Sequence, residues 1–202
     1  MKRSRFTRLT CVTRIIAGSI GSLRLKGAAN ATRPTSDRVK ESIFSKLDSL
    51  GLIEDAKVLD LFAGTGSLGL EAASRKAAEV IFVEKDKPAF ELLKANIDHA
   101  AKALKNQDLE SKFQAKNLEA SQALKNLPKS FFDLVFIDPP YDFSNQKLEE
   151  ILINLSPALK DRAALLIERS SKSEQFSIQQ GYELIEIKNY GDTSVTFLEF
   201  SI

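Results

Sequence analysis

From Lys57 onward, short apolar runs alternate with segments of helical periodicity, and this alternation restricts the possible folds more than any other feature. Runs rich in Val, Ile, Leu and Phe are typical of buried strands, whereas apolar residues three and four positions apart are typical of helices. Because parallel strands need a crossover helix between them, this order predicts an α/β fold with a doubly wound, mostly parallel sheet. We expect strands at 57–62, 79–84, 112–117, 131–137, 163–168, 182–190 and 193–200, and helices at 66–77, 87–104, 119–127 and 147–159.

The two ends of the chain depart from this alternation. Only Gly191 and Asp192 separate the last two apolar runs, which leaves no room for a crossover helix and predicts a hairpin that adds one antiparallel strand. Near the start, residues 12–27 contain two short strand-like runs, which predict a second hairpin followed by a helix. We therefore expect a small N-terminal extension, with a basic arm and hairpin in residues 1–35 and a main domain in residues 36–202.

Charge is distributed unevenly along the chain. Residues 1–40 contain ten Lys or Arg against one acid and carry +9, whereas the remaining residues carry −7, from 19 bases and 26 acids. A basic arm on an acidic body indicates a polyanionic partner, because phosphate neutralisation with release of counterions drives nucleic-acid binding. A solvated tail or a transit peptide would have a similar composition, so both alternatives stay open.

Several kinds of protein are excluded by composition. Cys11 is the only cysteine and His99 the only histidine, which excludes an internal disulfide and a Cys/His zinc cluster and indicates a reducing compartment. His99 lies in the predicted helix 87–104, which favours a solvated or packing role over a catalytic one. No apolar run approaches the ~18 residues of a membrane span. We expect no metal site and no membrane insertion.

A glycine-rich segment follows the first strand of the main domain. Gly64, Gly66 and Gly69 would let the backbone turn tightly and approach a ligand, and the helix that follows would present free N–H groups. Glu84 ends the second strand, where an acid binds ribose hydroxyls in dinucleotide folds. This pattern alone fits both NAD and S-adenosylmethionine.

Asp60 distinguishes these two ligands. It stands four residues before Gly64, where a carboxylate would attract a cationic amino acid group and repel a pyrophosphate. S-adenosylmethionine carries an ammonium and a sulfonium and no phosphate, so Asp60 favours the methyl donor. The alternative is that Asp60 caps its own loop.

The segment "IDPPY" ends the strand expected at 131–137. Consecutive prolines have no N–H to donate, so Asp138 and the carbonyl of Pro139 form a fixed pair of acceptors, and Tyr141 adds a face for stacking. Such a site suits the exocyclic amine of a nucleobase, because two acceptors would orient the nitrogen lone pair toward a methyl group. Without the glycine loop, a rigid loop capped by Asp138 would explain the same residues.

Together these features give the chain a family resemblance. It resembles the class I S-adenosylmethionine-dependent methyltransferases with a D-P-P-Y motif and, more closely, the bacterial 16S ribosomal RNA guanine-N2 methyltransferase family RsmD. The matching segments are "RIIAG" (14–18), "RPTSDRVKESIF" (33–44), "LDLFAGTGSLGLEAASR" (59–75), "VEKD" (83–86) and "DPPY" (138–141). The segment 33–44 is the most specific of these, since many methyltransferases share the others.

The resemblance implies a Rossmann-like methyltransferase fold and assigns roles to individual residues. Asp138, Pro139 and Tyr141 would be catalytic. The donor S-adenosyl-L-methionine would be bound by Asp60, Phe62, Gly64, Thr65, Gly66, Gly69, Glu84, Lys85, Asn117, Leu118 and Asp138. Many relatives have Asp where Asn117 stands, although the Asn side-chain oxygen still suits the adenine amine. RNA would be contacted by Arg14, Arg24, Lys26, Arg33, Thr35 and Arg38.

The resemblance also implies 16S ribosomal RNA as partner, within a small-subunit assembly particle, and a monomeric cytoplasmic enzyme. Alternatives remain open from the residues alone. The same D-P-P-Y chemistry serves adenine N6 in DNA or RNA and the glutamine side chain. An NAD-dependent oxidoreductase is disfavoured by Asp60, and a non-catalytic RNA-binding protein would explain only the basic arm.

Overall fold

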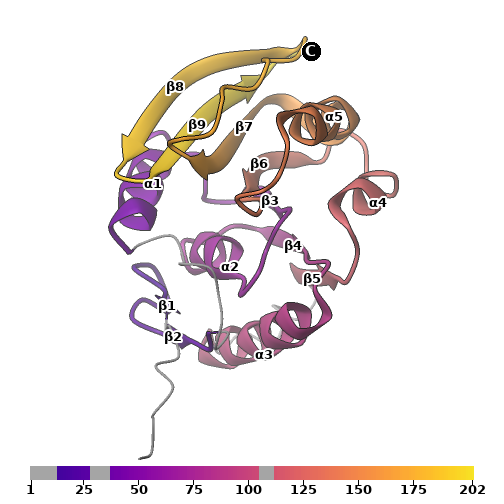
Figure 1. Cartoon of the computed structure of the whole chain (residues 1–202). Coiled ribbons are helices and arrows are strands. Elements are labelled where there is room, and N and C mark those ends of the chain that lie inside the picture. The colour runs from indigo at the N-terminus through magenta and orange to yellow at the C-terminus, as the bar shows by residue number, and fades with distance from the viewer. Residues whose placement is uncertain (1–12, 28–36, 105–111) are drawn as a thin grey trace, which may run out of the picture.

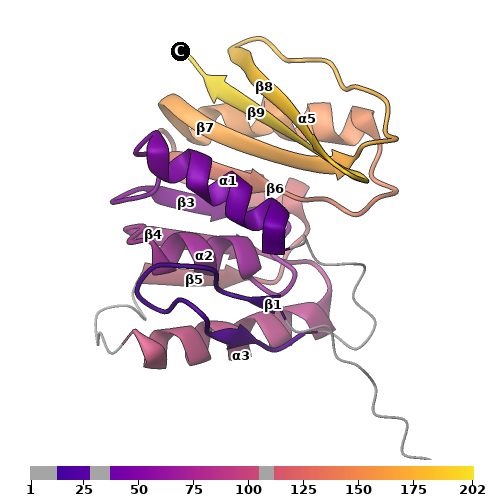
Figure 2. The ribbon, with the colours of Figure 1, turned by 90° about the vertical axis from the view of Figure 1, so that its left-hand side faces the viewer.

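The computed structural model describes residues 13–27, 37–104 and 112–202, which form a central sheet with helices on both faces (Figure 1 and Figure 2). Arg33 and Thr35, which were predicted to contact RNA, lie outside the described residues. No helix within these ranges is both long enough and apolar enough to cross a membrane.

The sheet has seven strands in the order β5-β4-β3-β6-β7-β9-β8. Neighbours from β5 to β7 are parallel, whereas β9 is antiparallel to both β7 and β8. The predicted doubly wound, mostly parallel sheet with one antiparallel strand is therefore confirmed. Its strands are β3 (Lys57–Asp60), β4 (Glu79–Val83), β5 (Phe113–Lys116), β6 (Phe132–Ile137), β7 (Leu159–Ser170), β8 (Tyr182–Tyr190) and β9 (Thr193–Phe200).

Two helical layers cover the sheet, because successive side chains of each strand point to opposite faces. In β3, for example, Val58 packs in one apolar cluster and Leu59 in the other. The first layer contains α1 (Asp37–Ser49), α2 (Ser67–Ser74) and α3 (Lys87–Ala103), and the second contains α4 (Ala120–Leu124) and α5 (Asn145–Leu155).

The largest difference from the predicted elements lies after α5. A helix was expected over 147–159, but α5 ends at Leu155 and a short 3-10 turn, Ser156–Ala158, leads directly into β7. Pro157 explains the change, because its ring cannot continue an α-helix and it has no N–H to donate.

The N-terminal hairpin consists of β1 (Thr13–Arg14) and β2 (Arg24–Leu25), which pair antiparallel as predicted. In Figure 2 it lies along the first helical layer, beside α2 and α3. Ile15 and Ile20 are buried in the same apolar cluster as the helices of that layer. The hairpin is therefore packed on the main domain.

This hairpin is held by a group of charged residues, which we call the hairpin clamp and which consists of Lys40, Glu71 and Arg75. Lys40 and Glu71 are fully buried, and Lys40 Nζ lies 3.9 Å from Glu71 Oε2. The Glu71 carboxylate accepts hydrogen bonds from the backbone N–H groups of Ile16 (2.6 Å) and Ala17 (3.1 Å) and from Arg75 Nε (2.9 Å). Burial lowers the pKa of Lys40, and the charge of Glu71 opposes this change. The clamp joins the hairpin to α1 and α2.

Candidate active site

A pocket of about 250 Å³ opens at the carboxyl ends of β3, β4, β6 and β7. Open α/β sheets bind their ligands at this edge. Of the residues predicted for the site, the structure brings together Phe62, Gly64, Thr65, Glu84, Lys85, Leu118, Asp138, Pro139 and Tyr141 as lining residues. Asp60, Gly66, Gly69 and Asn117 are not among them.

Gly64 and Glu84 form one wall of this pocket. Gly64 has a φ of 54°, a left-handed conformation that most side chains resist, and a Cβ there would meet open space rather than protein. Its N–H donates to Glu84 Oε2 over 2.8 Å, and Glu84 Oε1 accepts from the N–H of Asp86 over 2.7 Å. These bonds fix the Glu84 carboxylate at the pocket edge.

Asp60 and Gly69 lie behind this wall. Asp60 is 1% exposed, and its Oδ2 accepts a hydrogen bond from the N–H of Gly69 over 2.9 Å. Burial raises the pKa of Asp60 to about 7; the bond from Gly69 opposes this shift, and the charge of Glu84 adds to it. A Cβ on Gly69 would lie 2.3 Å from a ring atom of Phe82, so this glycine lets α2 pack on β4. This bond holds the Asp60 carboxylate at the first turn of α2, and its contact with the donor stays a prediction.

Asp138 directly follows β6 and faces other carboxylates. Burial raises its pKa well above the ordinary value, and the charges of Glu168 and Asp60 raise it further. These three acids come from β3, β6 and β7, which are neighbours in the sheet. Such a concentration of like charge is typical of functional sites.

The turn after Asp138 presents an aromatic ring to the pocket. Pro139 is buried, whereas Tyr141 is 56% exposed and lines the pocket, so its ring is accessible for stacking. Phe143 packs edge-on against Phe62 with ring centroids 5.3 Å apart. This contact anchors the turn against the loop that follows β3.

Arg169 secures the same turn from β7. Its Nη2 donates to the backbone oxygen of Phe143 over 2.8 Å. Within the described part of the chain, its Nε and Nη1 are buried and find no hydrogen-bond partner, and burial lowers the pKa of Arg169. Arg169 and Glu168 were not predicted as site residues, although the rule that ligands bind at strand ends applies equally to the strand expected at 163–168.

Asn117 lies just outside the pocket. Its Nδ2 donates to the backbone oxygens of Glu84 (2.8 Å) and Lys85 (3.1 Å). These two bonds orient the side-chain amide at the end of β4, beside the lining residue Leu118.

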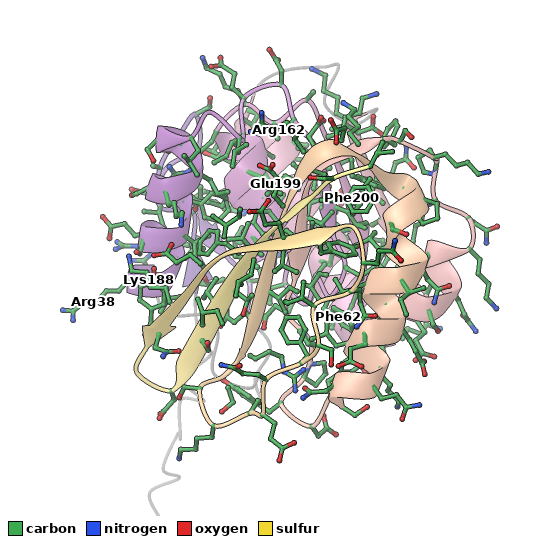
Figure 3. The ribbon with its side chains drawn as sticks, turned by 90° about the horizontal axis from the view of Figure 1, so that it is seen from above. Arg38, Phe62, Arg162, Lys188, Glu199 and Phe200 are labelled. Atoms are coloured by element: carbon green, nitrogen blue, oxygen red, sulfur yellow. The ribbon has the colours of Figure 1, made fainter. Side chains whose placement is uncertain are left out.

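Of the residues predicted to contact RNA, those within the described ranges lie on the hairpin and α1 and do not line the pocket. Arg14 pairs with Asp37, with Nε and Oδ2 3.0 Å apart, while Arg24 and Lys26 are exposed. Arg38 is exposed and extends outward from α1 (Figure 3). Their contact with RNA stays a prediction.

No group of His, Cys, Asp or Glu side chains within the described ranges is arranged to hold a metal ion. The pocket lining offers the carboxylates of Glu84, Asp138 and Glu168 and the exposed ring of Tyr141, beside the cations Lys85 and Arg169. This set of groups suits a cationic or amine-bearing ligand and a flat ring.

Comparison with known proteins gives consistent matches. The family described as "Conserved hypothetical protein 95" matches residues 13–199. "Ribosomal RNA small subunit methyltransferase D" of Haemophilus influenzae is 33% identical over 182 residues, which cover 90% of each chain. A Bacillus subtilis protein, named as a candidate rRNA methyltransferase, is 34% identical over 185 residues, which cover 90% of this chain and 96% of that protein.

Solved structures agree with these sequence matches. A structure from Escherichia coli, described as a candidate methyltransferase, has a TM-score of 0.78 at 29% identity and covers 94% of this chain and 98% of its own. A candidate methylase from Haemophilus influenzae has a TM-score of 0.73 at 32% identity and covers 95% and 99%.

Proposed function

Because the chain belongs to the RsmD family, matched as "Conserved hypothetical protein 95", we propose that it methylates the exocyclic N2 amine of a guanine in 16S ribosomal RNA. S-adenosyl-L-methionine would be the methyl donor. The observation that carries the proposal is that Gly64 and Glu84 share one pocket with Asp138 and Tyr141. Residues suited to a donor and residues suited to an amine acceptor therefore lie together.

The lining residues fit the proposed donor. Glu84 presents a carboxylate for ribose hydroxyls, and the acidic pocket complements the positive charges of the ammonium and sulfonium groups. Leu118 and Lys85 border the side where Asn117 is oriented, which suits the adenine ring. When bound, S-adenosylmethionine supplies a methyl group whose bond to sulfur breaks as the bond to N2 forms.

Asp138, Pro139 and Tyr141 would act on the acceptor base. Asp138 and the Pro139 carbonyl accept the hydrogens of the N2 amine, and Tyr141 stacks on the base. A target within the RNA must leave its own stack to reach them. The raised pKa of Asp138 makes its carboxylate a stronger base than an ordinary aspartate, so it is suited to receive the proton that N2 loses.

The basic arm of residues 1–35 and the hairpin would hold the RNA. The described part of this surface has three exposed cations, Arg24, Lys26 and Arg38. Such side chains form ion pairs with the phosphates of nucleic acids. We also propose that the substrate is an assembling small-subunit particle and that the enzyme acts as a monomer in the cytoplasm.

The test supplies labelled methyl donor together with small-subunit particles, naked 16S RNA, DNA or protein. The expected result is N2-methylguanine in the digest of the 16S RNA. Label found only in DNA, in protein or on adenine N6 would contradict the proposal.

A further inference from the structure

Glu168 lies beside Asp138 at the carboxyl edge of the sheet. In the parallel pair of β6 and β7, Ile137 is in register with Ile167, so the next residues, Asp138 and Glu168, stand level on neighbouring strands. Neighbouring strands are ~4.8 Å apart. Both residues line the pocket, and the charge of Glu168 is one cause of the raised pKa of Asp138.

Hydrogen bonds hold several polar groups of this corner in place. Ser170 accepts from the N–H of Lys172 over 3.2 Å, and Arg169 donates to the Phe143 carbonyl. On the donor side, Glu84 accepts from two backbone N–H groups. Glu84 is proposed to bind the donor and Asp138 the amine, so Glu168 is the acid of the described pocket lining that the proposed function does not use.

Two adjacent carboxylates repel each other, and a ligand with two adjacent donors relieves that repulsion. The Watson–Crick edge of guanine has such a pair, since N1–H stands next to the N2 amine. Adenine has an acceptor, N1, beside its N6 amine. A carboxylate facing N1 therefore attracts guanine and repels adenine, and enzymes that extrude a base read it by this edge.

We propose that Glu168 accepts a hydrogen bond from N1–H of the target guanine and thereby selects guanine over other amine-bearing bases. The inference rests on the proposed function, because it requires Asp138 to hold N2. Register supports this geometry, since the level position of Glu168 places a second acceptor next to the one that holds the amine. Glu168 is then a specificity-determining residue for this reaction.

The first test compares two target bases with the wild-type enzyme. Once the methylated position has been mapped, small-subunit particles are reconstituted on RNA with either guanine or 2,6-diaminopurine at that position. The two bases have the same N2 amine, but N1 of diaminopurine is an acceptor. A site that accepts a hydrogen bond from N1–H discriminates strongly against a base that has no hydrogen at N1. The kcat/KM with diaminopurine should therefore be lower than that with guanine by on the order of 100-fold or more.

In the variant Glu168→Gln, the ratio of kcat/KM with guanine to kcat/KM with diaminopurine should fall to about tenfold or less. A glutamine amide can donate a hydrogen bond to the acceptor N1 of diaminopurine. The matched control for this variant is Glu199→Gln on β9, outside the pocket, where Glu199 pairs with Arg162 (Figure 3). The control should keep the wild-type ratio. Binding of S-adenosylhomocysteine to each variant verifies that the donor side is intact.

Equal kcat/KM values of the wild-type enzyme with guanine and with diaminopurine would overturn the assignment. This comparison uses the wild-type enzyme alone, so it does not depend on whether a variant folds. A wild-type ratio that persists in Glu168→Gln would overturn it as well. Failure to methylate the guanine particle at all is a different result, which refutes the proposed function and the assignment together.

Discussion

The hairpin clamp and the pocket both hold buried charge, but with opposite arrangements. In the clamp, the Glu71 carboxylate meets two cations and two backbone N–H groups. In and behind the pocket, like charges lie close together: the charge of Glu84 adds to the raised pKa of Asp60, and the charges of Glu168 and Asp60 add to the raised pKa of Asp138. Paired charges are costly to break, whereas like charges gathered at one edge favour a ligand. The clamp therefore serves the fold, and the pocket serves binding and chemistry.

Breaking the clamp should give the largest loss of stability. Lys40→Met leaves the buried Glu71 with one cation fewer, and removal of one partner from a buried pair costs about 3 kcal/mol of unfolding free energy. Urea unfolding measures this loss. The exposed Lys102, changed to Met, is the control and should stay within about 0.5 kcal/mol of wild type. A Lys40→Met loss equally small would contradict the role of the clamp.

Neutralising Asp60, which lies behind the pocket wall, should increase stability, and the size of the increase should depend on pH. The folded-state pKa of Asp60, about 7, lies above its unfolded value, so the folded protein binds the proton more tightly and loses stability as pH rises toward 7. Asp60→Asn removes this dependence, and Asn can still accept from Gly69. As pH rises from 5 to 8, the unfolding free energy of the variant should increase relative to that of the wild type by on the order of 2 to 3 kcal/mol. Thermal unfolding at several pH values measures this, and parallel curves would contradict it.

Replacing Arg169, a cation of the pocket lining, should affect activity more than stability. Arg169→Met eliminates two buried donors without partners, so unfolding free energy should change by less than about 1 kcal/mol. The lost bond to Phe143 loosens the turn, and kcat should fall about tenfold while donor binding persists. Arg169→Lys, which retains a donor, should recover part of kcat. A large loss of stability with unchanged kcat would contradict this prediction and would mean that Arg169 stabilises the fold, as the clamp residues do.

The sequence predicted the sheet and half of the residues that line the pocket, because both depend on local patterns. Strand and helix periodicity gave the topology, and residues such as Glu84 and Asp138 follow strands whose ends converge. The orientation of Asp60 was not predictable in this way, since it depends on the bond to Gly69. Lys40 is two residues from Arg38, which was predicted to contact RNA, yet Lys40 is fully buried. Only the packing of the hairpin on α1 and α2 distinguishes this lysine from its exposed neighbours.

The central claim is that Asp138 holds the acceptor amine, and Asp138→Asn tests it most directly. The substitution keeps the shape and one acceptor oxygen of the side chain but removes its negative charge and its ability to receive the proton that N2 loses. Single-turnover methyl transfer to small-subunit particles should fall by on the order of 10³-fold, while calorimetry shows S-adenosylhomocysteine binding within about threefold of wild type. Transfer at the wild-type rate, or loss of transfer accompanied by an equal loss of donor binding, would contradict the claim.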